Sequence, residues 1–136
     1  MHMRFLNTKV HGILDYLVGI LLIISPWLFD FNRGGAETAV PIILGAGAII
    51  YSLFTNYELG IVKKISMKTH LWLDIVSGIF LAFSPWLFDF KEFVYLPHAI
   101  IGIFEILAGS ITQKNPSYNS NILSDGKNSS SNQVIR

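Results

Sequence analysis

The chain contains no cysteine and few charged residues. Asp, Glu, Lys and Arg together make up 14% of its 136 residues, whereas hydrophobic residues make up 51%. The absence of cysteine excludes disulfides and thiolate metal ligands. A soluble domain of this length needs more polar surface, so the composition indicates a membrane protein of one domain. The ten Lys and Arg residues are too few and too scattered for a nucleic-acid-binding surface, and we expect no nucleic-acid partner.

Enzyme motifs are absent as well. The sequence contains no Gly-rich phosphate loop, no GxSxG turn and no HExxH pair. We therefore expect that the protein is not an enzyme and that it carries no resident cofactor.

Four long runs of the chain contain no Asp, Glu, Lys or Arg. With their flanks, they reach the roughly 17 to 25 residues that a helix needs to cross the hydrocarbon layer. The sequence predicts an all-α bundle of four transmembrane helices, at about 10–29, 38–57, 69–88 and 94–112. The first run is not expected to be a cleaved signal peptide, because its pattern recurs in mid-chain.

The heptapeptide SPWLFDF occurs twice, at 25–31 and at 84–90. Residues before it match at one constant offset, namely Lys9 with Lys68, His11 with His70, Asp15 with Asp74, and Gly19 with Gly78. The bundle is thus predicted to consist of two parallel tandem repeats of a helical hairpin. The predicted segments are a short N-terminus (1–7), the first repeat (8–59), a linker (60–66), the second repeat (67–112) and a disordered polar tail (113–136).

The repeated motif has a structural interpretation that requires no ligand. Proline cannot donate a backbone hydrogen bond, so each motif should kink or end its helix, while the serine hydroxyl satisfies a freed backbone group. The tryptophan suits the level of the lipid headgroups. An outward binding surface is the alternative. The motif residues are Ser25, Pro26, Trp27, Ser84, Pro85 and Trp86.

A duplicated helical hairpin with Ser-Pro-Trp at the end of its first helix, preceded by His and Asp one turn apart, resembles the SPW-repeat family of small integral membrane proteins. The resemblance extends from about Thr8 to Thr112 and implies four helices in a prokaryotic cell membrane. It implies no activity and no catalytic residues. The second helices match less well, since Ile42 stands against His98 and Ile49 against Glu105.

Basic residues indicate the orientation. Lys and Arg gather before the first span, between the second and third, and after the fourth. By the positive-inside bias, both ends and the middle loop should face the cytoplasm, with both SPW segments on the outer side of the inner membrane.

Six ionisable residues interrupt the predicted spans. His11 and Asp15 lie one helical turn apart, as do His70 and Asp74, and the fourth span adds two more, His98 and Glu105. Such groups are costly in lipid, so they should point inward and find partners, and the repeat should bring the two His–Asp pairs together.

Three interpretations of these residues stay open. The pairs can be polar clamps that fix helix register. They can instead form a ladder for protons or cations with His98 and Glu105. The third possibility is a metal site, with His11, Asp15, His70 and Asp74 as candidate ligands, or a haem held by the two imidazoles.

The expected function follows from the small polar surface. We expect a structural or interaction module that associates laterally in the lipid bilayer, with a copy of itself or with another membrane protein. The alternative is a small transporter of protons, cations or other solutes that uses the His/Asp/Glu ladder.

Overall fold

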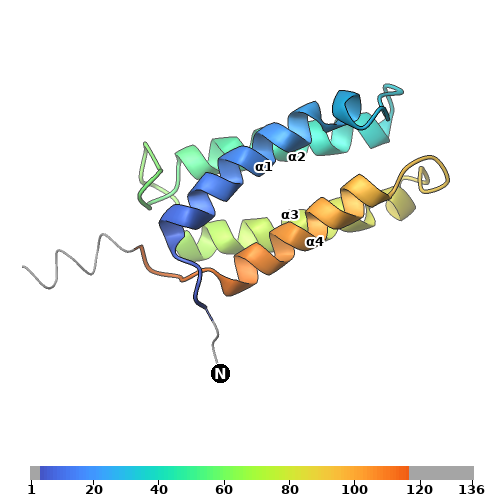
Figure 1. Ribbon diagram of the computed structural model, residues 1–136. Helices are drawn as coiled ribbons and strands as arrows, with labels where there is room; N and C mark the ends of the chain where they lie inside the picture. The colour runs from blue at the N-terminus through green and yellow to red at the C-terminus, as the bar shows by residue number, and fades with distance from the viewer. Residues whose placement is uncertain (1–3, 117–136) are drawn as a thin grey trace, which may run out of the picture.

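The computed structural model describes residues 4–116, and within this range the chain is all-helical (Figure 1). The helices are α1 (Thr8–Leu28), α2 (Ala36–Leu53), α3 (Met67–Leu87) and α4 (Leu96–Ile111). The predicted all-α class with four helices is therefore confirmed for the described residues. The predicted tail begins at residue 113, and its part from 117 onward lies outside the described residues, as do residues 1–3 of the predicted N-terminus.

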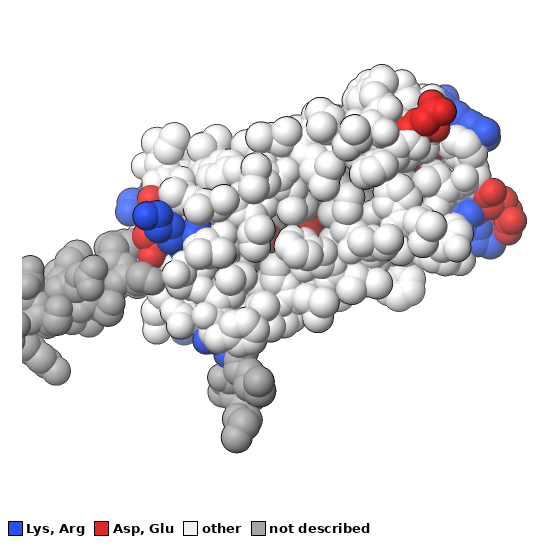
Figure 2. All heavy atoms as spheres, in the orientation of Figure 1, with Lys and Arg blue, Asp and Glu red and all other residues white. Residues whose placement is uncertain are grey.

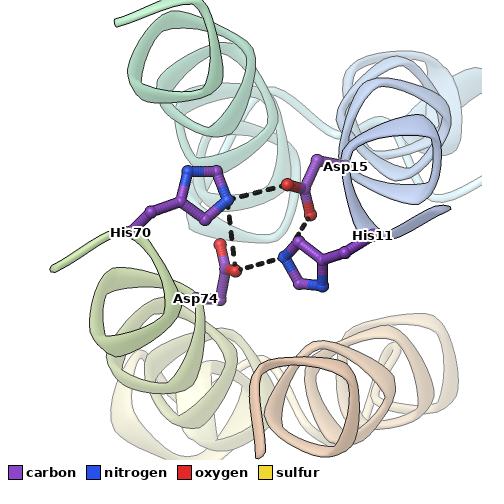
Figure 3. Close-up of side chains that lie close together, drawn as sticks. All are labelled: His11, Asp15, His70 and Asp74. Atoms are coloured by element: carbon purple, nitrogen blue, oxygen red, sulfur yellow. Dashed lines mark hydrogen bonds and ion pairs between the residues drawn. The ribbon is translucent and has the colours of Figure 1, made fainter. Parts of the chain in front are cut away.

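The helices pair as two hairpins laid against each other. Figure 1 shows α1 and α2 in one layer and α3 and α4 in the other. Within each layer the two helices pack along their length, whereas α2 touches α3 and α1 touches α4 over shorter stretches. In consequence α1 and α3 face one another diagonally across the centre of the bundle, as the view along the helices in Figure 3 shows.

Three of the four helices are long and apolar enough to cross a membrane, namely α1, α2 and α3. The fourth, α4, is apolar but has 16 residues, which at 1.5 Å per residue span about 24 Å of a hydrocarbon layer about 30 Å thick. On the face that Figure 2 draws, uncharged side chains cover the sides of the helices, and Lys and Arg with most of the visible Asp and Glu gather at the two ends of the molecule; a few acidic atoms show in a hollow between them.

Glycines let the helices of each hairpin approach closely. A Cβ atom built on Gly45 would lie 2.6 Å from the carbonyl oxygen of Gly19 in α1. In the other hairpin, a Cβ on Gly102 would lie 2.6 Å from the carbonyl oxygen of Gly78. No side chain fits at these contacts, so small residues set the spacing, as in other membrane helix pairs.

The proline of each SPW motif lies in the last turn of its helix and does not stop it at once. Pro26 cannot donate to the carbonyl oxygen of Leu22, four residues earlier. The Ser25 hydroxyl donates to that oxygen instead, at 2.8 Å. In α3 the Ser84 hydroxyl donates to Leu81 in the same way, at 2.7 Å. The serines therefore satisfy the backbone groups that the prolines free, as the sequence predicts.

The rest of each motif ends the helix. Asp30 adopts a left-handed backbone conformation with φ of 54°. The next amide, that of Phe31, then donates back to the Pro26 carbonyl at 2.9 Å, which is a Schellman cap. In α3, Asp89 (φ 57°) and the Phe90 amide repeat this geometry. Each SPWLFDF motif is thus one helix C-terminus with its cap.

At the opposite end of the bundle, short backbone bridges join the two hairpins. Leu6, before α1, pairs with Thr112, which follows α4. Ile65, before α3, pairs with Thr55, which follows α2. Each threonine is therefore held beside the first turns of α1 or α3, where the ionisable residues lie.

Candidate functional site

His11 and Asp15 of α1 meet His70 and Asp74 of α3 in the centre of the bundle (Figure 3). The closest contacts cross between the repeats: His11 Nε2 lies 2.8 Å from an Asp74 oxygen, and His70 Nε2 lies 2.7 Å from an Asp15 oxygen. Contacts within each helix are longer, at 3.1 and 3.4 Å. Both imidazoles are fully buried. The predicted approach of the two pairs is confirmed.

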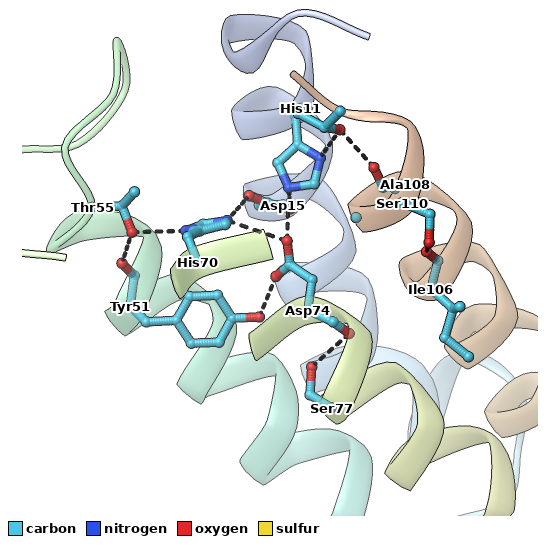
Figure 4. Close-up of polar contacts among 12 residues, drawn as sticks. His11, Asp15, Tyr51, Thr55, His70, Asp74, Ser77, Ile106, Ala108 and Ser110 are labelled. Atoms are coloured by element: carbon cyan, nitrogen blue, oxygen red, sulfur yellow. Dashed lines mark hydrogen bonds and ion pairs between the residues drawn. The ribbon is translucent and has the colours of Figure 1, made fainter. Parts of the chain in front are cut away.

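One threonine hydroxyl lies beside the outward nitrogen of each imidazole, and Figure 4 shows Thr55 in this position beside His70. His11 Nδ1 lies 2.8 Å from the Thr112 hydroxyl, and His70 Nδ1 lies 2.7 Å from the Thr55 hydroxyl. Each hydroxyl donates its single proton to the backbone carbonyl four residues earlier in the chain. The threonines must therefore accept from the imidazoles, so both rings carry a proton on Nδ1 and turn Nε2 toward the centre.

Asp74 receives a further hydrogen bond that Asp15 lacks. The Tyr51 hydroxyl of α2 donates to Asp74 Oδ1 at 2.6 Å, while Asp74 Oδ2 faces the imidazoles. At the end of the cluster, the ring of Tyr57 packs 5.5 Å from that of His70, between centroids. Burial raises the pKa of the Tyr57 phenol, and the nearby Asp15 carboxylate raises it further, so this phenol stays protonated.

A small cavity adjoins the cluster. His11, Asp15, Asp74, Tyr51 and Glu105 line it together with apolar side chains. It leaves about 10 Å³ for the centre of a water-sized sphere, which corresponds to roughly one water molecule. Oε2 of Glu105 is buried without a hydrogen-bond partner among the described residues. The structure thus places Glu105 across a small cavity from the His–Asp cluster, without a hydrogen bond to it.

His98 lies elsewhere. Its Nε2 donates to the backbone carbonyl of Glu37 at 2.9 Å, and the rings of Phe31 and Phe90 pack against it with centroids 5.0 and 4.9 Å away. Pro41, four residues after Glu37, cannot donate to this carbonyl. His98 therefore replaces the hydrogen bond that α2 loses at its proline.

Apolar side chains separate His98 from Glu105. Leu22, Leu81 and Ile101 belong to one buried core cluster. Along α1, α3 and α4 respectively, each of them comes between the SPW end, where His98 lies, and the His–Asp cluster. The structure does not bring the six intramembrane residues into one group; it brings five together and places His98 beyond this layer.

The motif tryptophans point outward. Trp27 and Trp86 are 61% and 50% exposed, and Trp86 also packs on Tyr95, with 6.0 Å between ring centroids. The serines and prolines of the motif are buried instead.

The sequence gives little indication that some residues belong to the site. In the structure Thr55 and Thr112 follow the second helix of each repeat at equivalent places. Their offset of 57 residues is one more than the offset that pairs Ile42 with His98 in the sequence, so that pairing conceals the correspondence. Tyr51 has no such counterpart, because the equivalent residue in α4 is Ala108. The Glu37 carbonyl that holds His98 is backbone, so no side-chain pattern marks it.

The arrangement can perform two of the roles expected from the sequence. As a clamp, it joins α1 to α3 through buried, reciprocal contacts between imidazoles and carboxylates. As a metal site, it offers four ligand atoms, one from each residue, within 4.8 Å of one another. A haem does not fit between these imidazoles, because both carboxylates occupy the space that the macrocycle needs.

Comparison with protein families supplies a match over most of the chain. The SPW repeat domain matches residues 9–112. The chain belongs to the SPW repeat family. The match contains all four helices except the first residue of α1, and the complete His–Asp cluster. Comparisons with curated proteins and with solved structures found no match. Together with its long apolar helices, membership of the SPW repeat family makes this a membrane protein.

Proposed function

We propose that this SPW repeat protein is a structural or interaction module that acts by lateral association within the bilayer, with a copy of itself or with another membrane protein. It is not an enzyme in this proposal. One observation supports it above all: large apolar side chains project from the lateral surface of every helix, for example Leu17 (60% exposed), Ile43 (67%), Phe83 (62%) and Ile100 (61%). Exposing this apolar surface to water would cost free energy, whereas contact with lipid or with another membrane helix would not.

The interior supports the same proposal. The imidazoles and carboxylates of the His–Asp cluster form hydrogen bonds with one another and with threonines of the same chain. A set of satisfied buried polar groups specifies how helices pack. Hydrogen bonds between membrane helices contribute about 0.6 kcal/mol each on average, which is enough to fix the register of α1 against α3 without making the bundle rigidly dependent on any one of them.

We further propose an inner-membrane orientation with both chain ends in the cytoplasm and both SPW segments outside. The segment before α1, the loop between α2 and α3 and the segment after α4 share one end of the bundle: a backbone bridge joins Leu6 to Thr112, and the Thr8 hydroxyl donates to Glu58 of the loop. That end carries Arg4, Lys9, Lys64, Lys68 and Lys114. The other end has fewer basic residues, so the positive-inside bias supports this orientation.

Site-specific photocrosslinking in native membranes tests lateral association. A photoreactive residue at Leu17, which projects outward, should give a discrete protein adduct. The same residue at Leu22, which is 1% exposed, is the matched control and should react only within the chain. Adducts with lipid alone at Leu17, Ile43 and Ile100 would refute the proposal.

Transport is a second candidate, favoured by the unpartnered Glu105 oxygen in the cavity beside Asp15 and Asp74. Buried carboxylates in membrane helices are frequent members of proton and cation pathways. Proton flux into proteoliposomes of the purified protein tests it, with Glu105→Gln as the variant. Flux that is absent, or equal in the variant, would count against transport.

A further inference from the structure

We propose that His11, Asp15, His70 and Asp74 bind one zinc ion in a tetrahedral site that joins α1 to α3. The site is built wholly from this chain and does not depend on lateral association or transport. Its support comes from the distances between the ligand atoms, the direction of the imidazoles, the charge of the group and the types of donor.

The four ligand atoms lie near the spacing of such a site. Zinc ligands lie about 2.0 to 2.1 Å from the ion in a tetrahedron, which places the ligand atoms about 3.3 Å from one another. The four imidazole–carboxylate contacts measure 2.7, 2.8, 3.1 and 3.4 Å, with Asp15 presenting a different oxygen to each imidazole. One ligand atom from each residue can be chosen so that all four lie within 4.8 Å of one another. The most distant pair would have to close by up to about 1.5 Å to surround the ion.

The surroundings orient the ligands as in known zinc sites. A zinc-bound histidine donates its other N–H to a fixed acceptor, which selects the tautomer and aims the ring. Here the acceptors are the hydroxyls of Thr112 and Thr55, each held by a backbone carbonyl. Both Nε2 atoms consequently face the centre, and Tyr51 holds the outer oxygen of Asp74.

The charge of the group also suits a divalent ion. Each short contact between an Nε2 and a carboxylate oxygen needs one proton between the two atoms, so the cluster holds two protons there. When zinc binds, each imidazole loses its Nε2 proton and forms one N–Zn bond, and two protons leave for solvent. The ion brings two positive charges in their place, so the buried group stays neutral and avoids the cost of an uncompensated charge.

The donor set selects among metals. Two imidazole nitrogens and two carboxylate oxygens suit zinc, whereas calcium and magnesium prefer six or more oxygen ligands. The adjoining cavity, which Glu105 lines, gives room for about one water molecule next to the site.

Metal binding by the full-length protein in detergent micelles tests the proposal. After treatment with a chelator, the protein is incubated with zinc, and free metal is removed by gel filtration. We expect one zinc ion per chain by elemental analysis, retained in the presence of excess magnesium or calcium. Zinc content well below one per chain would overturn the proposal.

Spectroscopy of the unmodified protein tests the ligands without any variant. Cobalt in place of zinc should give the intense visible bands of a tetrahedral site, and X-ray absorption of the zinc form should show two imidazole nitrogens and two oxygens. The weak bands of six-coordinate cobalt, or a shell without imidazole, would contradict the assignment.

A matched pair of variants locates the site. Asp15→Asn keeps the shape of the side chain but removes its charge, and should weaken zinc binding by at least about tenfold. Glu105→Gln changes a neighbouring carboxylate outside the four ligands and should leave one zinc per chain. Unchanged affinity in both Asp15→Asn and Asp74→Asn would show that the ion binds elsewhere.

Discussion

The buried histidine of α4 illustrates how one residue compensates for another in a different hairpin. Pro41 leaves the Glu37 carbonyl without its intrahelical donor, and His98 supplies that donor from across the bundle. The two motif phenylalanines, Phe31 and Phe90, enclose the ring. A buried carbonyl that loses its donor is left without a hydrogen bond. The contribution of His98 to stability therefore depends on the presence of Pro41.

This dependence is testable by a double-mutant cycle. His98→Phe should destabilise the protein by about 1 to 3 kcal/mol, because it leaves the Glu37 carbonyl buried and unpaired. The same change in a Pro41→Ala background should cost clearly less, since the new backbone amide at position 41 can then donate to the Glu37 carbonyl. Thermal or denaturant unfolding in detergent measures both differences.

Pro97 provides the control for this cycle. It lies in the first turn of α4, where no intrahelical acceptor precedes it, so Pro97→Ala should not reduce the cost of His98→Phe. Equal costs of His98→Phe in all three backgrounds would show that the hydrogen bond to Glu37 is of little importance.

The capping aspartates offer a second prediction. Asp30 takes a left-handed conformation that glycine adopts without steric cost. Asp30→Gly should therefore keep or raise the unfolding temperature, with a gain of up to about 1 kcal/mol, whereas Asp30→Ala should lower it. The pair Asp89→Gly and Asp89→Ala repeats the comparison. A less stable glycine variant at both positions would mean that the carboxylate itself stabilises the turn.

For single residues, the sequence predicts those contacts that both repeats make. The His–Asp pairs recur at a constant offset, so their meeting across the bundle follows from repetition alone, and the serine bonds follow from the chemistry of proline. Tyr51 and the acceptor of His98 occur once only. Their roles depend on which helices are neighbours, and this information is absent from local sequence.

Among the elements, the closest contacts occur between glycines of paired helices. A methyl group at Gly102 would lie 2.6 Å from both the Gly78 carbonyl oxygen and the Ala82 amide nitrogen. Backbone atoms cannot move aside as a side chain can, so α3 and α4 would have to separate. Gly102→Ala should destabilise the protein by about 1 to 3 kcal/mol.

Gly47 is the matched control for this substitution. It also lies within a helix, α2, but a methyl group there would meet nothing within 4 Å. Gly47→Ala should be neutral or stabilising by about 0.5 to 1 kcal/mol, because alanine loses less conformational freedom. Unfolding measured side by side for the two variants tests the contrast; equal effects would contradict close packing at Gly102.

Two helix boundaries differ from those that the apolar runs of the sequence predict. The second helix is expected to reach residue 57 but ends at Leu53, because the chain then turns back and Thr55 pairs with Ile65. The fourth is expected from residue 94 but begins at Leu96, where Pro97 fits a first turn. Apolar runs mark what lies in the bundle, and backbone pairing decides where each helix stops.

In the molecule as a whole, the two hairpins pack as one unit because side chains of each repeat bind side chains of the other. His11 bonds Asp74 and His70 bonds Asp15, while the threonine that supports His11 follows α4 and the one that supports His70 follows α2. This reciprocity suggests that the hairpins share one orientation in the bilayer. Both SPW turns should then face the same side of the membrane.

Single-cysteine labelling tests that orientation on a clean background, because the chain contains no cysteine of its own. Asn32→Cys and Glu92→Cys, in the two exposed SPW-side loops, should react with a membrane-impermeant maleimide added to intact cells. Lys64→Cys, in the loop that joins the hairpins, should react only after permeabilisation. Labelling of Asn32→Cys and Glu92→Cys from opposite sides would show that the hairpins are inverted relative to one another, which the diagonal meeting of His11 with Asp74 does not permit.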